Sequence, residues 1–252
     1  MNNVIHSEKM KLKRTFITPV TLIYPLGIVM ISFLLILMQK NNFMERNYNM
    51  WDAMVVMTQF VIMFLIPLAI TIISSNLINV EHQTNSWKFL FALPVGKSQF
   101  YFSKLFYLLK LCFFSALIIF IGFILIGKTL GFSGGVPYLL LLKAAFLPYL
   151  GSFPIITLQL WISTQFKNQA FPIGIGILGA ISTFFLQMNE STSYLFWAYP
   201  AMMTPVKLLL SNGSLGDIVT NDGVALYTTL SIIFGLLFLL IGLIKFNKQQ
   251  VD

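Results

Sequence analysis

The chain has 252 residues, of which 57% are hydrophobic and only 10% are charged. A soluble domain of this size could not bury so much apolar side chain, so the composition excludes an ordinary soluble protein and indicates one whose main solvent is lipid. The formal net charge is +8, but the 16 basic residues mostly flank apolar runs, which indicates contact with anionic lipid headgroups and not with nucleic acid.

The first 17 residues mix basic and apolar side chains, which predicts a short N-terminal interfacial helix that turns into the first span at Thr18 and Pro19. A frayed basic tail is the alternative. The run that follows has about 21 apolar residues, the length of a span and not of a signal-peptide core, so we expect no cleavable signal.

Six segments reach the roughly 20 apolar residues that cross a bilayer core. An open strand in lipid leaves backbone groups unpaired, so each is predicted to be a helix. They are residues 18–38, 54–78, 105–127, 136–163, 171–188 and 224–244. The prediction is therefore an all-α integral membrane fold with six transmembrane helices, in a single transmembrane domain over residues 1–252.

Basic residues in the connections distinguish the two topologies. With the N-terminus inside, ten lie in cytoplasmic pieces and four in external ones. The ten are Lys9, Lys11, Lys13, Arg14, Lys88, Lys97, Lys104, Lys167, Lys245 and Lys248, and the four are Lys40, Arg46, Lys128 and Lys207. This count predicts a multi-pass protein of the cell membrane with both termini cytoplasmic.

Residues 194–210 are nearly apolar but contain Pro200, Pro205 and Lys207. A seventh crossing there would place the basic C-terminal tail outside, so an external re-entrant or interfacial segment is favoured.

Two motifs imitate nucleotide sites. Gly96, Lys97 and Ser98 resemble the end of a P-loop, but Phe91 stands where that motif needs a glycine. The GxGxxG pattern that begins at Gly174 lies in a predicted span and not between a strand and a helix, so close helix packing is the better interpretation. Acids and histidines are scattered, which leaves metal binding and acid–base catalysis unsupported; we expect no metal, no catalytic residue and no cofactor on this chain.

The polar insert from Glu81 to Lys104 separates the second and third predicted spans. Trp87, Leu90 and Phe91 follow the spacing of one helical face, and Pro94 and Gly96 end that helix. Ser98 can then start a helix that continues into the third span. The pattern predicts a short cytoplasmic helix lying along the membrane plane.

This arrangement resembles the permease subunits of type-2 ABC exporters. In that family a glutamate closes the second span, a coupling helix follows, and a Leu-Pro-Val/Ile-small-basic stretch leads to a lysine that opens the third span. The matching residues are Glu81, Leu93-Pro94-Val95-Gly96-Lys97 and Lys104. Many members carry Gly-Thr before the coupling helix, where this chain has Thr84 to Trp87. Its Trp-Lys pair is similar to the permeases of Gram-positive bacteria that confer lantibiotic immunity or bacitracin resistance.

The resemblance implies a membrane subunit that is moved by a separate ABC ATPase, which would bind ATP and Mg²⁺. A second permease subunit or a second copy, membrane lipids and a peptide substrate are the other implied partners, with no nucleic acid. Coupling to the ATPase is expected at Glu81, Trp87, Lys88, Phe91, Pro94, Lys97 and Lys104. Lys143, an ionisable residue within a span, is a candidate for a polar path, with snorkelling as the structural alternative.

Three functions follow from these observations. The first is an exporter permease that expels a lantibiotic-like peptide or another amphipathic compound, such as an unrelated lipid or drug. The second is a non-transporting anchor or sensor for a partner protein. The third, an intramembrane enzyme, lacks the acids, histidines or metal set that it would need within the spans.

Overall fold

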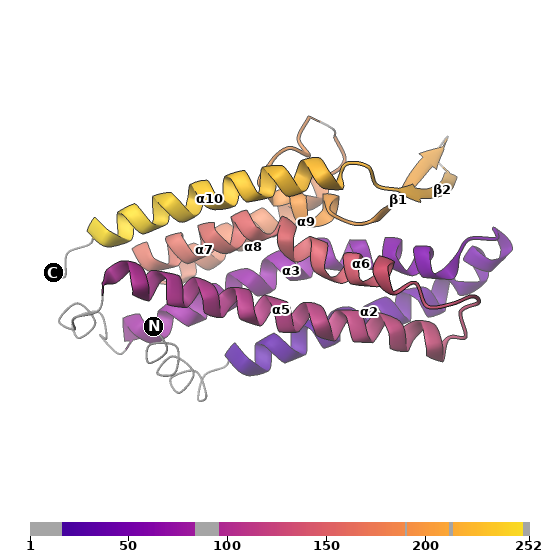
Figure 1. Cartoon of the computed structure of the whole chain (residues 1–252), viewed down its shortest axis with the longest axis horizontal. Coiled ribbons are helices and arrows are strands. Elements are labelled where there is room, and N and C mark those ends of the chain that lie inside the picture. Colours follow the sequence, from indigo (N-terminus) through magenta and orange to yellow (C-terminus); the bar gives the residue numbers. More distant parts are fainter. Residues whose placement is uncertain (1–16, 84–95, 190, 212–213, 249–252) are drawn as a thin grey trace.

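The computed structural model describes residues 17–83, 96–189, 191–211 and 214–248. Seven helices of at least 13 residues run roughly along one direction (Figure 1). They are α2 (Ile17–Glu45), α3 (Met50–Gln83), α5 (Lys97–Thr129), α6 (Tyr138–Gly151), α7 (Phe153–Gln165), α8 (Ala170–Leu186) and α10 (Val224–Lys248). Between α8 and α10 lie η1 (Phe196–Ala198), α9 (Tyr199–Met202), β1 (Val206–Ser211) and β2 (Ser214–Thr220).

Five of the predicted spans are confirmed as helical segments long and apolar enough to cross a membrane: α2, α3, α5, the α6–α7 pair and α10. The span predicted at 171–188 corresponds to α8, which has 17 residues. At 1.5 Å per residue, α8 is about 25 Å long, somewhat less than a typical hydrocarbon core. Six crossings therefore remain a prediction.

The span predicted as one helix over 136–163 is two helices that meet at Ser152. Pro154, in the first turn of α7, has no N–H to donate to the Leu150 carbonyl one turn earlier. The Ser231 hydroxyl from α10 donates to that carbonyl instead, at 2.6 Å. The break is stable because a neighbouring helix replaces the missing hydrogen bond.

Residues 194–210 contain no helix longer than the four-residue α9, which agrees with the prediction that they do not cross the membrane. Tyr199, Ala201 and Met203 are fully buried against the bundle. The chain then forms an antiparallel hairpin of β1 and β2 that the sequence analysis did not predict. The Tyr48 hydroxyl, beside the start of α3, donates to the Gly216 carbonyl and fixes β2 to the bundle.

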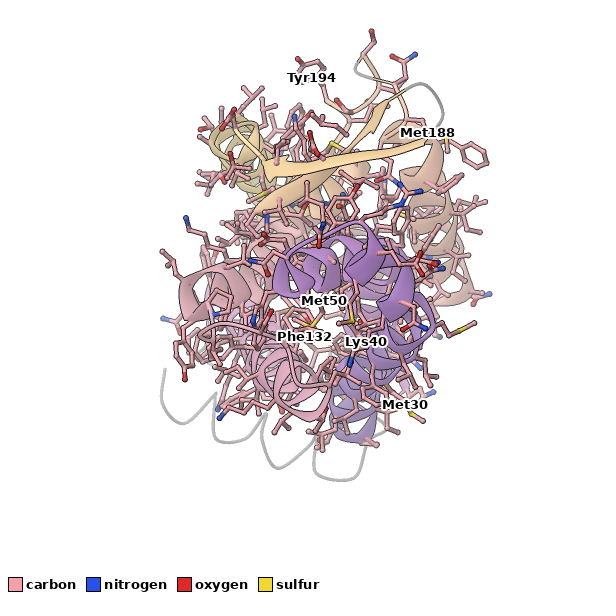
Figure 2. The ribbon with its side chains drawn as sticks, turned by 90° about the vertical axis from the view of Figure 1, so that its right-hand side faces the viewer. Met30, Lys40, Met50, Phe132, Met188 and Tyr194 are labelled. Atoms are coloured by element: carbon pink, nitrogen blue, oxygen red, sulfur yellow. The ribbon has the colours of Figure 1, made fainter. Side chains whose placement is uncertain are left out.

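The bundle has two ends. The Glu81 end holds the last turn of α3, the start of α5, the α7–α8 connection and the last turn of α10, and the hairpin end holds the α2–α3 and α5–α6 connections with β1 and β2 (Figure 1). Figure 2 looks onto the hairpin end, where Lys40, Met50 and Phe132 lie below the strands. The Lys40 ammonium donates to the Leu130 carbonyl at 2.9 Å, which joins the last turns of α2 to the α5–α6 connection. Along the chain, successive connections between the long helical segments lie at opposite ends of the bundle, as the predicted topology requires.

Helix α3 is the central element: it packs against every other long helix except α10 and is the most buried of the five long segments. Many large apolar side chains of α2, α5, α8 and α10 are exposed on the outside of the bundle, as expected for residues that face lipid. The residues of the predicted N-terminal interfacial helix, 1–16, lie outside the described residues.

Candidate coupling site

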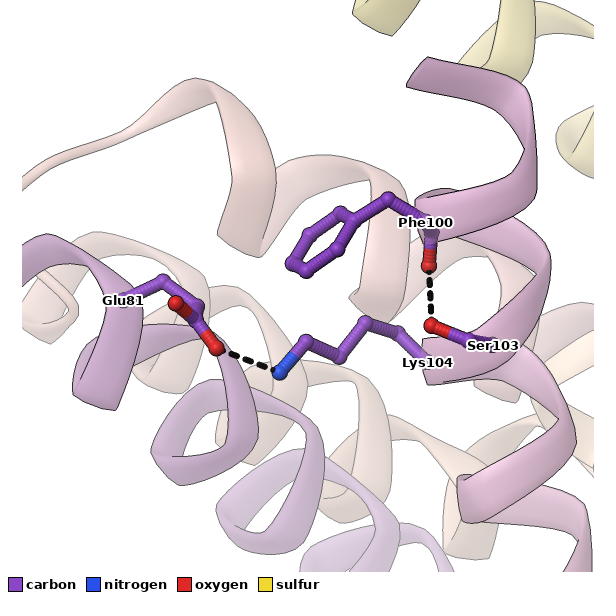
Figure 3. Close-up of polar contacts among 4 residues, drawn as sticks. All are labelled: Glu81, Phe100, Ser103 and Lys104. Atoms are coloured by element: carbon purple, nitrogen blue, oxygen red, sulfur yellow. Dashed lines mark hydrogen bonds and ion pairs between the residues drawn. The ribbon is translucent and has the colours of Figure 1, made fainter. Parts of the chain in front are cut away.

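An ion pair joins α3 to α5 at the Glu81 end. The Lys104 Nζ atom lies 2.8 Å from Glu81 Oε1, and the two side chains are 1% and 0% exposed (Figure 3). Glu81 stands in the last turn of α3 and Lys104 in the second turn of α5. The pair therefore joins the helix that precedes residues 84–96 in the sequence to the helix that follows them.

Aromatic and polar neighbours enclose the lysine. The Lys104 ammonium lies 5.0 Å from the centroid of the Phe100 ring, within the range of a cation–π interaction. The Ser103 hydroxyl donates to the Phe100 carbonyl at 2.7 Å, as Figure 3 shows. The Phe100 ring stacks on Phe246 at 6.1 Å, which connects this part of α5 to α10.

Because both side chains are buried, each charge is stabilised mainly by the other. Transfer of a carboxylate or an ammonium from water into the protein interior costs several kcal/mol of free energy. The attraction of an opposite charge at hydrogen-bonding distance offsets a cost of that order. Removal of either partner leaves an uncompensated buried charge. The ion pair thus joins the end of α3 to the start of α5.

A second link joins α5 to α10. The Lys97 ammonium donates to the Asn247 carbonyl at 3.3 Å, and Ser98 and the Asn247 side chain exchange hydrogen bonds at 3.0 and 3.2 Å. Helix α5 begins at Lys97, one residue before the start expected at Ser98, and runs without interruption through the third span. The start of α5 is therefore joined to the last turn of α10.

A third link, which the sequence analysis missed, joins α3 to the α7–α8 connection. Near the end of α7 the Ser163 carbonyl accepts a hydrogen bond from Gln169 Nε2 at 3.1 Å and contacts His82 Nε2 at 3.3 Å. Carbonyls at a helix end lack partners within the helix, so polar side chains from two other elements satisfy this one. A histidine directly after Glu81 was the only sequence signal of this contact.

Of the predicted coupling residues, the structure pairs Glu81 with Lys104, whereas Lys97 contacts Asn247 of α10. Trp87, Lys88, Phe91 and Pro94, together with the predicted coupling helix, lie outside the described residues. Lys143 is exposed on α6, beside the buried residues Ala144 and Ala145. It is not part of the polar cluster at the Glu81 end.

The glycine pattern in α8 packs against neighbouring elements. A Cβ atom at Gly176 would collide with Thr71 on α3 and with Gln159 on α7, and one at Gly179 would collide with Trp197. These contacts confirm the interpretation as helix packing. Among the described residues no three His, Cys, Asp or Glu side chains come close enough to hold a metal ion. What the described residues show is a set of polar contacts that join α3, α5, α7 and α10 at the Glu81 end.

Comparison with known proteins gives one match. The profile of a family described as ABC-2 family transporter protein matches residues 4–183, which is more than half of the chain and includes Glu81, the insert and Lys104. No curated protein and no solved structure matches the chain significantly.

Proposed function

The chain belongs to the ABC-2 family of transporter proteins as a membrane permease component, and on this premise we propose that it forms the transmembrane path of an ATP-driven exporter. The observation that carries the mechanism is the buried Glu81–Lys104 pair at the base of the insert. A displacement applied to residues 84–96 reaches α3 and α5 together because the pair does not let their ends separate.

ABC-2 permeases pair with an ABC ATPase, and we propose that the insert is where this ATPase docks. The apolar face of Trp87 and Phe91 suits a groove on a partner, by the helix-in-groove mode of recognition. ATP and Mg²⁺ would be bound by that partner. A second permease subunit, either a copy of this chain or a related one, would complete the path across the membrane.

The proposed cargo is an amphipathic compound, with a lantibiotic-like peptide as the first candidate. The Trp87-Lys88 pair and its resemblance to immunity and resistance permeases support that class. In this proposal the Glu81 end and both termini are cytoplasmic, as the count of basic residues favours. The hairpin end then faces the compartment in which such a peptide acts.

Copurification and transport test the proposal. A tagged chain, coexpressed with a candidate ABC ATPase from the same genome and extracted in mild detergent, is expected to copurify with that ATPase. Trp87→Ala is expected to lower both copurification and peptide-stimulated ATP hydrolysis, with membrane insertion unchanged. Phe185→Ala is the matched control, because it removes an aromatic side chain that is exposed on α8.

Two results would count against the proposal. Transport by Trp87→Ala equal to that of the unmodified chain would remove the insert as the docking element. A susceptibility panel of cells with and without the chain and its ATPase tests the cargo: equal sensitivity to every amphipathic peptide would exclude peptide export.

A further inference from the structure

Polar side chains form a ladder between α3 and α7, which lie side by side in the bundle and run in the same direction (Figure 1). Ser75 Oγ on α3 lies 3.3 Å from Ser163 Oγ on α7. Four residues earlier on each helix, Thr71 and Gln159 both pack directly against Gly176 of α8. Residues four apart share one helix face, so these contacts form consecutive rungs. Ser74, three residues after Thr71, lies on the same side of α3 by helical spacing. We refer to Thr71, Ser74, Ser75, Gln159 and Ser163 as the polar ladder.

Several atoms of the polar ladder have no hydrogen-bond partner in the protein. Both amide atoms of Gln159 and the hydroxyl of Ser74 are unpaired, although both side chains are 0% exposed. With Gln169 Oε1, they make up four of the eight such side-chain atoms in the described part of the chain. A buried polar atom without a partner costs about 1–3 kcal/mol, so this concentration in one seam needs a ligand outside the chain.

The seam leads toward water at the Glu81 end. One turn beyond Ser163 lie the half-buried His82 and the largely buried Gln169, both in contact with the Ser163 carbonyl. The next residues, Lys167 and Asn168, are exposed. A continuous row of polar groups thus connects the solvent-facing α7–α8 connection with Gln159 in the middle of the bundle.

Most other buried hydroxyls of the described bundle are satisfied within the protein, those of Tyr101 and Thr204 excepted. Ser115 on α5 is 0% exposed and donates to the Leu111 carbonyl of its own helix at 3.0 Å. Ser32 on α2, also 0% exposed, likewise donates to the Ile28 carbonyl at 2.6 Å. Hydroxyls in lipid-embedded helices commonly make such bonds, so burial alone does not explain the unpaired atoms of the seam.

We propose that the seam between α3 and α7 is a hydration site, in which water enters from the Glu81 end and binds the Gln159 amide and the Ser74 hydroxyl. Water fits the chemistry because it donates and accepts, as an amide with both an idle N–H and an idle oxygen requires. The seam carries no buried charge beyond Glu81 and Lys104 among the described residues, which favours a neutral ligand. This proposal is independent of the cargo and of the docking of an ATPase.

Cysteine reactivity tests the proposal, because a thiol reacts as its thiolate and ionises readily only where water reaches it. Ser74→Cys and Ser163→Cys are made separately in a Cys112→Ala background, and reaction with N-ethylmaleimide is followed in native membranes. Both are expected to react at least about tenfold faster than Ser115→Cys, an equally buried serine on α5. In inside-out and right-side-out vesicles, a charged, membrane-impermeant thiol reagent is expected to label Ser163→Cys only from the Glu81 side.

The role of Gln159 is tested by Gln159→Leu combined with Ser74→Cys. Loss of the amide is expected to slow the reaction of Cys at position 74 toward the rate of the Ser115→Cys control. Rates at 74 and 163 equal to that control would overturn the hydration site. Fast reaction that Gln159→Leu leaves unchanged would overturn the assignment of the water to Gln159. Monodisperse elution of each variant in detergent verifies that the comparison concerns folded protein.

Discussion

At the scale of single residues, the Lys104 ammonium and the Glu81 carboxylate share a position from which water is almost entirely excluded. The sequence suggested both residues as functional, because each ends or opens a predicted span next to a polar insert. It did not show that they meet, because 23 positions separate them. Their pairing depends on the way in which α3 and α5 lie side by side.

Lys104→Met tests the pair. The substitution keeps the length of the side chain but leaves the Glu81 carboxylate buried without its partner, so we expect a loss of about 3–5 kcal/mol in stability. Denaturation by SDS in mixed micelles measures the change. Lys143→Met, at an exposed lysine, is expected to change stability by less than about 0.5 kcal/mol.

The double variant Glu81→Leu with Lys104→Met separates an electrostatic from a packing effect. Replacement of both charges by apolar groups of similar volume is often neutral or stabilising, so most of the lost stability should return. Peptide-stimulated ATP hydrolysis would then show whether the link between α3 and α5 needs the charges themselves. A double variant as unstable as Lys104→Met alone would contradict the described pairing.

At the scale of elements, the packing of α8 is set by its small residues. Gly176 lies where α3, α7 and α8 meet, and Gly174, two residues earlier, has nothing within 4 Å of the position that a Cβ atom would occupy. The two glycines belong to the same sequence pattern. Only the structure distinguishes the one that makes the contact from the one that does not.

Gly176→Ala and Gly174→Ala form a matched pair of substitutions. At Gly176 the added methyl group overpacks the contact with Thr71 and Gln159, and we expect a loss of about 1–3 kcal/mol. At Gly174 the same change adds helix propensity without a collision, so stability should stay the same or rise by up to about 1 kcal/mol. Thermal unfolding in detergent compares the two. Equal effects at both positions would show that α8 does not pack on α3 as described.

The helices were more predictable than their interruptions. Apolar length alone placed α2, α3, α5 and α10, since lipid requires each crossing segment to satisfy its own backbone. The break at Ser152 was not predictable from Pro154, because many membrane helices tolerate a proline; it depends on the Ser231 hydroxyl of α10. The hairpin was missed for a similar reason, since Tyr48, from another part of the chain, fixes β2 in place. The Ser163 contacts with His82 and Gln169 likewise arise only from tertiary structure.

At the scale of the whole molecule, the position of α8 decides the topology. It is about 25 Å long, shorter than the other crossing segments, yet it connects the exposed Lys167 at the Glu81 end with the elements that lead to the hairpin. If α8 crosses the membrane, the chain has six spans and both termini lie on one side. If it does not, the hairpin and the α7–α8 connection share a side.

Single cysteines in a Cys112→Ser background distinguish the two arrangements. Lys167→Cys and Lys248→Cys mark the Glu81 end, and Asp217→Cys marks the hairpin; all three native side chains are exposed. An impermeant maleimide added to intact cells is expected to label only Asp217→Cys, with the other two labelled after permeabilisation. The reason is that basic residues favour the cytoplasmic side and α8 carries the chain across. Labelling of both Asp217→Cys and Lys167→Cys in intact cells, or of neither, would show that α8 does not span the bilayer, and would place the C-terminus opposite the N-terminus.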